Sequence, residues 1–231
     1  MNDKKYIKFL DGKKVVIVGP SWHISKIDQL DLINSYDVVV RMNIGYRIPE
    51  KIKKCTGDRI DILYCSLNDY YIKNDYFTKK IMKKLSLKLK WITLTHVGLH
   101  KAAWRELKKV NKNIHIPIHL TEKKHYNFLF DKTKKKLSCG IVAIYDLLKY
   151  NIKQLYVTGF TFYDVRVIGR RKTYYSGYNK NNMVYSKRPV ASHSLNAELR
   201  IFKKMQKSDN RLICDDILKK IIKQGRIASS S

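Results

Sequence analysis

Short β-branched apolar runs alternate along this chain with segments in which apolar residues recur at helical spacing. The apolar runs predict strands that are buried on both faces of a sheet. Strands are expected at residues 15–18, 37–41, 60–64, 91–95, 154–158 and 211–214, and helices at residues 25–34, 77–87, 100–110, 139–150, 194–207 and 216–223. This alternation predicts an α/β fold with one Rossmann-like, doubly wound, mostly parallel sheet. The length of 231 residues fits a single domain.

Polar or glycine-containing turns follow three of the predicted strands. They are Gly19-Pro20-Ser21, Arg41-Met42-Asn43 and Gly159 through Tyr163. Right-handed crossovers bring the carboxyl ends of parallel strands to one edge of the sheet, and ligands bind at that edge. The sequence therefore predicts a binding site that these turns form together.

The first two turns carry groups suited to a nucleotide. Gly19 lets the backbone approach a phosphate closely, and the segment after Pro20 and Ser21 offers free N–H groups at a helix start. Asn43 has both a donor and an acceptor for a ribose or a phosphate. Taken singly, each residue is also typical of an ordinary turn, so the hypothesis depends on their shared edge.

A further anion-binding position is predicted at Ser138-Cys139-Gly140, which begins a helix. The free N–H groups of a helix N-terminus attract negative charge. A simple cap by Ser138 is the alternative interpretation. Cys139 is expected to pack or to present its backbone rather than to act as a nucleophile.

The segment from Ser192 to Glu198 supplies a candidate base. His193 precedes Ser194, which can cap the following helix, and Glu198 lies on that helix. A histidine held at a helix start and open to a cleft suits general-base catalysis, because its pKa lies near neutrality. The alternative is a plain capped helix with a surface histidine.

Residues 165–191 show no strong periodicity and mix tyrosines with basic side chains, among them Tyr174, Tyr175 and Arg188. Segments of this length inside a compact domain are typically functional lids or disordered. We therefore predict a flexible lid over an anionic or sugar ligand. A basic insertion without such a role is the alternative.

Composition narrows the range of partners. Lys and Arg number 48 against 19 Asp and Glu, and the net charge of +29 favours nucleic acid, an anionic membrane surface, or charged sugar nucleotides and glycans. The basic residues are spread along the whole chain, so a merely solvated surface is the alternative. No apolar run reaches the roughly 18 residues of a membrane span, and the N-terminus lacks the apolar core of a secretory signal. A cytoplasmic location is expected.

Cysteine and metal-ligand patterns limit the chemistry further. The cysteines form no Cys-x-x-Cys pair, so reduced thiols are expected at Cys55, Cys65, Cys139 and Cys214. No Asp-x-Asp occurs, and the histidines show no ligand spacing, so no metal cofactor is expected. The Asp215-Asp216 pair is interpreted as a helix cap.

Taken together, these segments resemble the sialyltransferases. Residues 14–21 through 36–43 look like the large sialylmotif of the eukaryote-type enzymes, residues 137–140 through 155–160 look like their small motif, and His193 with Glu198 reproduces the terminal His-x4-Glu. The bacterial sialyltransferases with a variant single-Rossmann fold are similar too. They share the Gly-Pro-Ser turn, the Arg-x-Asn strand end, a Phe-Tyr pair (here Phe162-Tyr163) and a His-Ser that opens a helix.

The resemblance implies a fold of variant GT-A type and an inverting transfer from CMP-sialic acid to a glycan hydroxyl, with no metal or other cofactor. By position, His193 would be the base and Glu198 would support it. Tyr163 and one of Tyr174 or Tyr175 would donate to the leaving phosphate. The nucleotide would be held by Gly19, Pro20, Ser21, Asn43, Ser138, Cys139, Gly140, Gly159 and Phe160.

Some positions depart from the family pattern and leave alternatives open. Pro20 stands where the eukaryote-type enzymes usually have Asn, and Cys139 stands for their Thr; their disulfide and membrane anchor are missing. Bacterial relatives place an Asn after the third strand, where Cys65, Ser66 and Asn68 are all candidates. CMP-Kdo or another CMP-activated acidic sugar is therefore an alternative donor.

The resemblance also sets the expected partners. They are a CMP-sugar and a glycan acceptor, with peripheral contact to an anionic membrane surface and no nucleic acid. A basic nucleic-acid-binding α/β module, or a glycan-binding protein that kept the fold, is the rival class.

Overall fold

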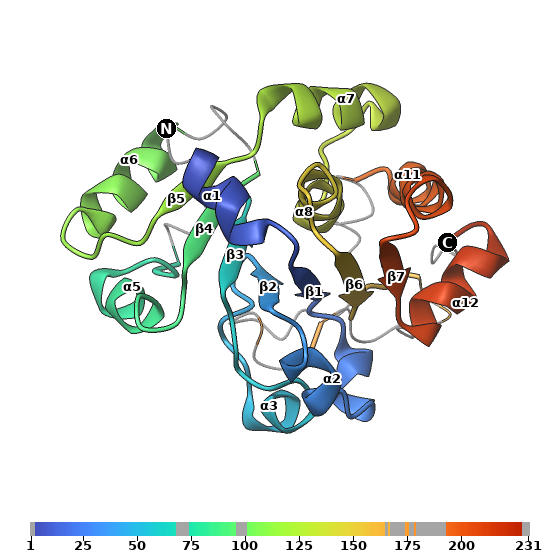
Figure 1. Ribbon diagram of the computed structural model, residues 1–231, viewed down its shortest axis with the longest axis horizontal. Helices are drawn as coiled ribbons and strands as arrows, with labels where there is room; N and C mark the ends of the chain where they lie inside the picture. Colours follow the sequence, from blue (N-terminus) through green and yellow to red (C-terminus); the bar gives the residue numbers. More distant parts are fainter. Residues whose placement is uncertain are drawn as a thin grey trace.

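The computed structural model describes residues 3–67, 74–95, 101–164, 166, 174, 175, 178 and 193–227. Within these residues one seven-stranded sheet has the order β5-β4-β3-β2-β1-β6-β7, with every neighbouring pair parallel (Figure 1). The strands are β1 (Lys14–Val18), β2 (Val38–Met42), β3 (Ile62–Cys65), β4 (Trp91–Leu94), β5 (Ile118–Leu120), β6 (Gln154–Thr158) and β7 (Leu212–Cys214). The predicted α/β fold with one doubly wound parallel sheet is confirmed.

Helices cover both faces of the sheet because the strand side chains alternate between two apolar cores. Val15 and Ile17 of β1 belong to one core, and Val16 and Val18 to the other. The first core includes α1 (Asp3–Leu10), α7 (Lys123–Thr133), α8 (Cys139–Leu147), α11 (Leu195–Ser208) and α12 (Asp216–Gln224). The second includes the 3-10 helix η1 (Trp22–Lys26), α2 (Leu30–Asn34), α3 (Glu50–Thr56), α5 (Lys79–Leu85) and α6 (Lys101–Asn111).

The helix predicted over residues 25–34 was wrong in its first half. Ile27 is extended, with φ −126° and ψ 117°, and it separates η1 from α2. The backbone N–H of Gln29 donates to the carbonyl of Cys55 in α3 rather than to a helical partner. Tertiary pairing therefore replaces the first turns of the predicted helix. The sequence patterns also missed α1, α3, β5 and α7.

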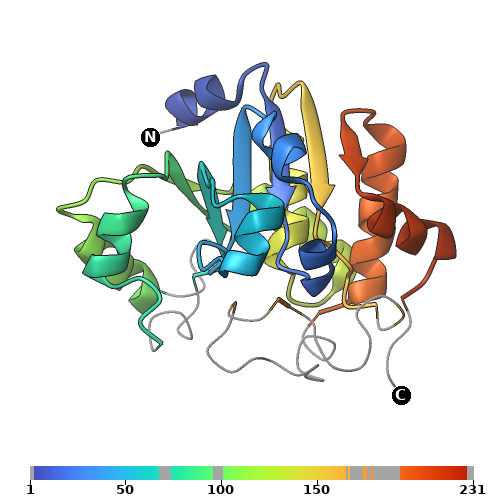
Figure 2. The same ribbon diagram turned by 90° about the horizontal axis from the view of Figure 1, so that it is seen from below.

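The order of the strands creates a switch point between β1 and β6. From β1 the chain passes through β2, β3, β4 and β5 on one side, then crosses back to β6 on the other. Figure 2 shows the sheet from the side, with β1 and β6 running together. Crevices at the carboxyl ends of strands beside such a reversal bind ligands in doubly wound folds.

Two further expectations concern the predicted lid and membrane-spanning helices. The predicted lid lies outside the described residues except for Arg166, Tyr174, Tyr175 and Tyr178. None of the helices in the described ranges is both long and apolar enough to cross a bilayer.

Candidate active site

A pocket lies at the carboxyl ends of β1, β2 and β6 and at the start of α8. Eleven residues singled out from the sequence line it: Pro20, Ser21, Asn43, Ser138, Cys139, Gly140, Gly159, Phe160, Tyr163, Tyr174 and Glu198. Five other residues complete the lining: Met42, Thr161 and Phe162 lie within the predicted turns, Tyr178 lies in the predicted lid segment, and Leu195 was not assigned from the sequence. Asn68 lies outside the described residues.

The floor of the pocket depends on two glycines at the switch point. A Cβ built on Gly19 would lie 2.3 Å from the carbonyl oxygen of Gly159, so β1 and β6 end in direct backbone contact. Gly159 also has φ +74°, a conformation that side-chain-bearing residues rarely adopt. Gly19 does not line the pocket itself; it permits the close approach that brings Ser21 and Gly159 together.

Gly140 leaves room for an aromatic ring. A Cβ at Gly140 would lie 2.4 Å from Cε1 of Phe160. The first turn of α8 therefore packs directly against the Phe160 ring, and both residues form part of the pocket wall. Any larger residue at position 140 would displace this ring.

Asn43 is held in a strained turn with one end of its amide engaged. Its φ is +54°, in the left-handed region that Asn tolerates better than most residues. Its Oδ1 accepts from the backbone N–H of Ser66 at 3.0 Å and from the Ser66 hydroxyl at 3.3 Å. Its Nδ2 makes no hydrogen bond within the described ranges, so this donor is available to a ligand. Of Cys65 and Ser66, Ser66 is the residue that fixes Asn43.

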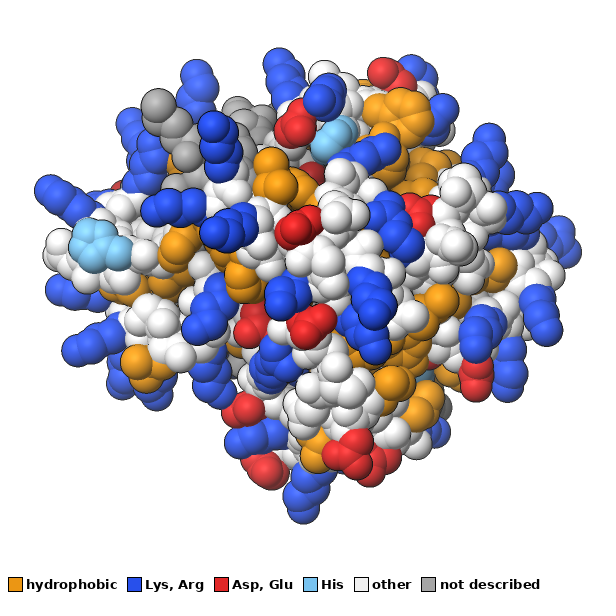
Figure 3. Space-filling view, in the orientation of Figure 1, with side chains coloured by type: hydrophobic (Ala, Val, Ile, Leu, Met, Phe, Trp, Pro, Cys, Tyr) orange, Lys and Arg blue, Asp and Glu red, His pale blue; other side chains and the backbone are white. Residues whose placement is uncertain are grey.

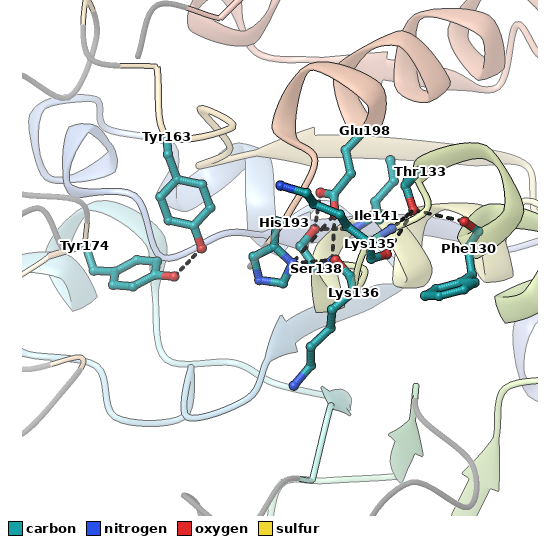
Figure 4. A network of polar contacts seen from close by, with 10 residues as sticks. All are labelled: Phe130, Thr133, Lys135, Lys136, Ser138, Ile141, Tyr163, Tyr174, His193 and Glu198. Atoms are coloured by element: carbon teal, nitrogen blue, oxygen red, sulfur yellow. Dashed lines mark hydrogen bonds and ion pairs between the residues drawn. The ribbon is translucent and has the colours of Figure 1, made fainter. Parts of the chain in front are cut away.

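The N-terminus of α8 already holds a carboxylate. Glu198 accepts from the Ser138 backbone N–H at 2.8 Å and from the Ser138 hydroxyl at 2.6 Å, as Figure 4 shows. Ser138 also caps the helix by accepting from Ile141 N at 3.4 Å. Burial raises the pKa of Glu198 to about 7, although the two bonds from Ser138 oppose that shift. The carboxyl group of Glu198 therefore occupies part of the anion-binding position predicted at the start of α8.

His193 is oriented by a backbone carbonyl beside this cluster. Its Nδ1 lies 2.7 Å from the Lys136 carbonyl oxygen and 3.9 Å from Glu198 Oε1. A carbonyl can only accept, so Nδ1 carries the proton and Nε2 of the neutral ring presents a lone pair. Burial lowers the pKa of His193 below its ordinary value. The side chain is 16% exposed and is not among the residues that line the pocket; its link to the pocket is Glu198.

Tyrosines close one side of the pocket. The hydroxyls of Tyr163 and Tyr174 are hydrogen-bonded to each other, and Tyr178 donates to the Met42 carbonyl at 3.1 Å (Figure 4 shows the first pair). Tyr174 forms an isolated antiparallel β-bridge with Ser21, which connects this segment to the turn after β1. Phe162 and Tyr163 both have positive φ, and such strained residues gather at functional sites.

Tyr174, rather than Tyr175, is the tyrosine of this pair that lies at the pocket. Tyr174 lines the pocket, whereas Tyr175 is 5% exposed, is not among the lining residues and interacts electrostatically with Arg41. The backbone N–H of Tyr175 donates to the Pro20 carbonyl at 3.0 Å. Tyr175 therefore anchors the segment and does not reach the pocket.

The site also has to be examined for a reactive thiol, for metal ligands and for clustered positive charge. Cys139 is 6% exposed, and burial raises the pKa of its thiol, so it presents no thiolate to the pocket. Among the described residues no three His, Cys, Asp or Glu side chains are grouped so as to hold a metal ion. Lys and Arg side chains are distributed over the whole face seen in Figure 3 rather than gathered in one patch.

A parallel sheet with a pocket at its switch point is typical of the doubly wound α/β folds, which bind their ligands at that place. No protein-family model and no curated relative matches the sequence. The fold is similar to that of the sialyltransferase CstII from Campylobacter jejuni solved with cytidine-5′-monophosphate: the TM-score is 0.55 and the identity 18%, over 88% of this chain and 80% of that one. The same enzyme solved with the substrate analogue CMP-3FNeuAc gives a TM-score of 0.53 and 16% identity, over 91% and 84% of the two chains.

A third structure of that enzyme, with a trisaccharide acceptor and CMP, gives a TM-score of 0.51 and 16% identity over 87% of this chain and 80% of that one. At such identities the similarity establishes a shared fold. The resemblance seen in the sequence is confirmed to that extent: the chain has the fold of a sialyltransferase.

Proposed function

We propose that this chain is a glycosyltransferase of the sialyltransferase type, which moves a CMP-activated acidic sugar, with sialic acid as the first choice, to a hydroxyl of a glycan. The observation that carries the proposal is the convergence of Asn43, the start of α8 and the Tyr163–Tyr174 pair on one pocket at the switch point. The shared fold with sialyltransferases solved with CMP supports it.

His193 is the proposed general base. Its neutral Nε2 takes the proton of the acceptor hydroxyl while the hydroxyl oxygen attacks the anomeric carbon and the bond to the CMP phosphate breaks. This displacement inverts the anomeric configuration. The Lys136 carbonyl supports the role because it holds the required tautomer. A positioned base typically contributes about 10²–10⁴-fold in rate.

Tyr163 and Tyr174 are the proposed donors to the departing phosphate. The hydrogen bond between the two hydroxyls uses one of their two protons. Burial raises the pKa of Tyr174, so this group stays protonated. Donors aimed at charge that develops in the transition state lower the barrier. Asn43 Nδ2 would hold the nucleotide itself.

The proposed reaction uses no metal ion. Hydroxyl donors and the N-terminus of α8 would carry the phosphate charge. We expect a chelator to leave the rate unchanged, and a strict requirement for Mn²⁺ would overturn this part of the proposal.

The direct test measures CMP release from CMP-sialic acid and from CMP-Kdo with a panel of glycan acceptors, with product configuration read by NMR. We expect an inverted product from CMP-sialic acid. Thermal-shift measurements with CMP, UMP, GMP and AMP provide the control, because a bound ligand raises the apparent stability. Saturable CMP binding without turnover would indicate a glycan-binding protein. Salt-dependent binding to duplex DNA without CMP binding would indicate the nucleic-acid module.

A further inference from the structure

Two Asp-x-Arg pairs share one hydrogen-bond arrangement, at Asp164–Arg166 and at Asp209–Arg211. In each pair the arginine donates from its backbone N–H and from Nε to Oδ1 of the aspartate, and from Nη2 to Oδ2. A guanidinium that binds both oxygens of a carboxylate fixes the relative orientation of the two groups. The second pair precedes β7, whereas the first directly follows Tyr163, which lines the pocket.

The first pair closes a turn of strained residues. Phe162 and Tyr163 lie in the left-handed region, with φ of 47° and 59°, and the backbone N–H of Asp164 donates to the carbonyl of Thr161 at 2.9 Å. Backbone of this kind persists only where the surrounding structure holds it. Asp164 is 0% exposed, and a buried carboxylate requires partners. The bonds from Arg166 meet that requirement and hold the end of the turn.

Arg166 also connects the turn to the C-terminal segment. Its Nη2 donates to the Arg226 carbonyl at 2.6 Å, and the backbone N–H of the next residue, Ile227, donates to Oδ1 of Asn196 at 2.8 Å. Ile227 is buried in the first core, which holds this segment in place. Asn196 is the second residue of α11. Polar contacts therefore run from the turn that carries Tyr163 to the start of α11.

An aromatic contact joins the same two elements. The ring of Phe162 packs edge-on against that of Phe202 in α11, with the centroids 5.8 Å apart. Tyr163 follows Phe162 in the turn, and His193 stands just before the N-cap of α11. The proposed phosphate donor and the proposed base are therefore placed by two elements that contact each other. Such placement matters because a shift of about 1 Å can cost on the order of 10²-fold in rate.

We propose that Asp164 and Arg166 are positioning residues, which hold the Tyr163 hydroxyl where the leaving phosphate departs, with Arg226 as the anchor on the C-terminal side. The inference rests on the proposed function, since it assumes that Tyr163 donates to that phosphate. Neither Asp164 nor Arg166 lines the pocket, so both act through Tyr163 rather than by contact with the ligand. Loss of the Asp164–Arg166 pair should therefore slow transfer no more than loss of the Tyr163 hydroxyl does.

The test is a double-mutant cycle on kcat with the CMP-sugar that the wild type turns over. Arg166→Met removes the pair, and because the Arg166 side chain is 37% exposed we expect the variant to fold, which its unfolding temperature checks. It should lower kcat about five- to tenfold, the loss expected for one donor to the leaving phosphate. In the Tyr163→Phe background the same substitution should cost less than about twofold, because the group through which it acts is already gone.

Two further variants make the cycle specific. Arg166→Lys keeps a positive charge beside the buried Asp164 and cannot bind both carboxylate oxygens in parallel, so it enters the same cycle with the same expectation and replaces Arg166→Met if that variant unfolds. Arg211→Met is the matched control, because it removes the same arrangement from Asp209 and frees the carbonyls of Leu148 and Tyr150. It should lower the unfolding temperature, and its effect on kcat should be equal with and without the Tyr163 hydroxyl.

The outcomes separate this inference from the proposed function. Equal costs of the Arg166 substitutions in the two backgrounds overturn the inference alone, and so does a rate that neither substitution changes. A wild type that releases no CMP from CMP-sialic acid or from CMP-Kdo overturns the proposed function, and the inference with it.

Discussion

A histidine–carboxylate pair lies near each end of helix α8. At the N-terminal end, His193 lies 3.9 Å from Glu198, which is bound to Ser138. At the C-terminal end, His125 lies 3.4 Å from Asp146. Both carboxylates are almost completely buried, with exposures of 1% and 0%. The residue types are the same, and the difference lies in what surrounds them.

At the C-terminal end, the carboxylate of the pair is bound by protein donors, and neither member of the pair lines the pocket. Asp146 accepts from the Tyr64 hydroxyl at 2.8 Å, Tyr64 pairs with the Tyr6 hydroxyl at 3.0 Å, and Thr93 donates to Tyr6 at 3.1 Å. At the other end, Glu198 lines the pocket, and within the described ranges Nε2 of His193 has no partner. A buried ionisable pair is structural when protein donors enclose its carboxylate, and it is available for chemistry when its carboxylate lines a pocket.

The largest effect is expected for His193→Ala. It should lower kcat/KM about 10²–10⁴-fold, as expected for the loss of a general base, with the unfolding temperature and CMP affinity little changed. His125→Ala is the matched control, and it should lower the unfolding temperature while keeping most of the activity. Because burial lowers the pKa of His193, the acidic fall of the wild-type rate should lie below pH 6.5. Full activity of His193→Ala would reject the base assignment.

The second effect concerns the free energy of unfolding at the pocket end. The pKa of Glu198 is about 7 in the folded chain against an ordinary 4.5, so the folded state holds this proton more tightly. That contribution is complete below pH 4.5 and is lost as the pH rises through 7. The stability of Glu198→Gln relative to the wild type should therefore improve by on the order of 3 kcal/mol between pH 4.5 and 8.

Urea unfolding of both proteins across this pH range measures that difference. Glu122→Gln is a useful control, because Glu122 is exposed and its pKa is lowered by Lys124. It should show a small change of the opposite sign. A difference for Glu198→Gln that does not vary with pH would contradict the assignment.

The third prediction concerns the His125–Asp146 pair at the C-terminal end of α8. Tyr64→Phe removes the hydroxyl that donates to Asp146, and a buried carboxylate that loses a donor should cost about 1–3 kcal/mol of stability. Transfer activity should stay close to that of the wild type, since Tyr64 does not line the pocket. Thermal unfolding and initial rates on the same preparations test both halves, and a large loss of rate in a stable variant would count against the distinction drawn here.

The smallest effect is expected for Tyr163→Phe, the corresponding loss of a tyrosine hydroxyl at the pocket. Loss of one neutral donor to the leaving phosphate should slow kcat about five- to tenfold, which corresponds to about 1 kcal/mol. The stability should hardly change. Tyr175→Phe is the control, because Tyr175 is buried and does not line the pocket; if it slowed transfer as much as Tyr163→Phe, the pocket assignment of the tyrosines would fail.

The sequence predicted most of the sheet because its strands are continuous apolar runs. The six expected strands are all present, whereas β5 has three residues and is too short to give a pattern. The turns at Gly19, Asn43 and Ser138 were found because parallel topology brings strand and helix ends together. The hydrogen bond from Tyr178 to the Met42 carbonyl was missed, because contacts between distant segments leave no local signal.

The pairing of β1 with β6 affects the order in which parts of the molecule fold. Lys14 is paired with Gln154, 140 residues further along the chain, and the Gly19–Gly159 contact depends on that pairing. Such distant pairings form late, since a long loop must close before any contact compensates its entropy. During synthesis the pocket at the switch point therefore cannot form until the last third of the chain has emerged. A nucleotide that binds there as proposed would stabilise only those refolding molecules that have completed this pairing.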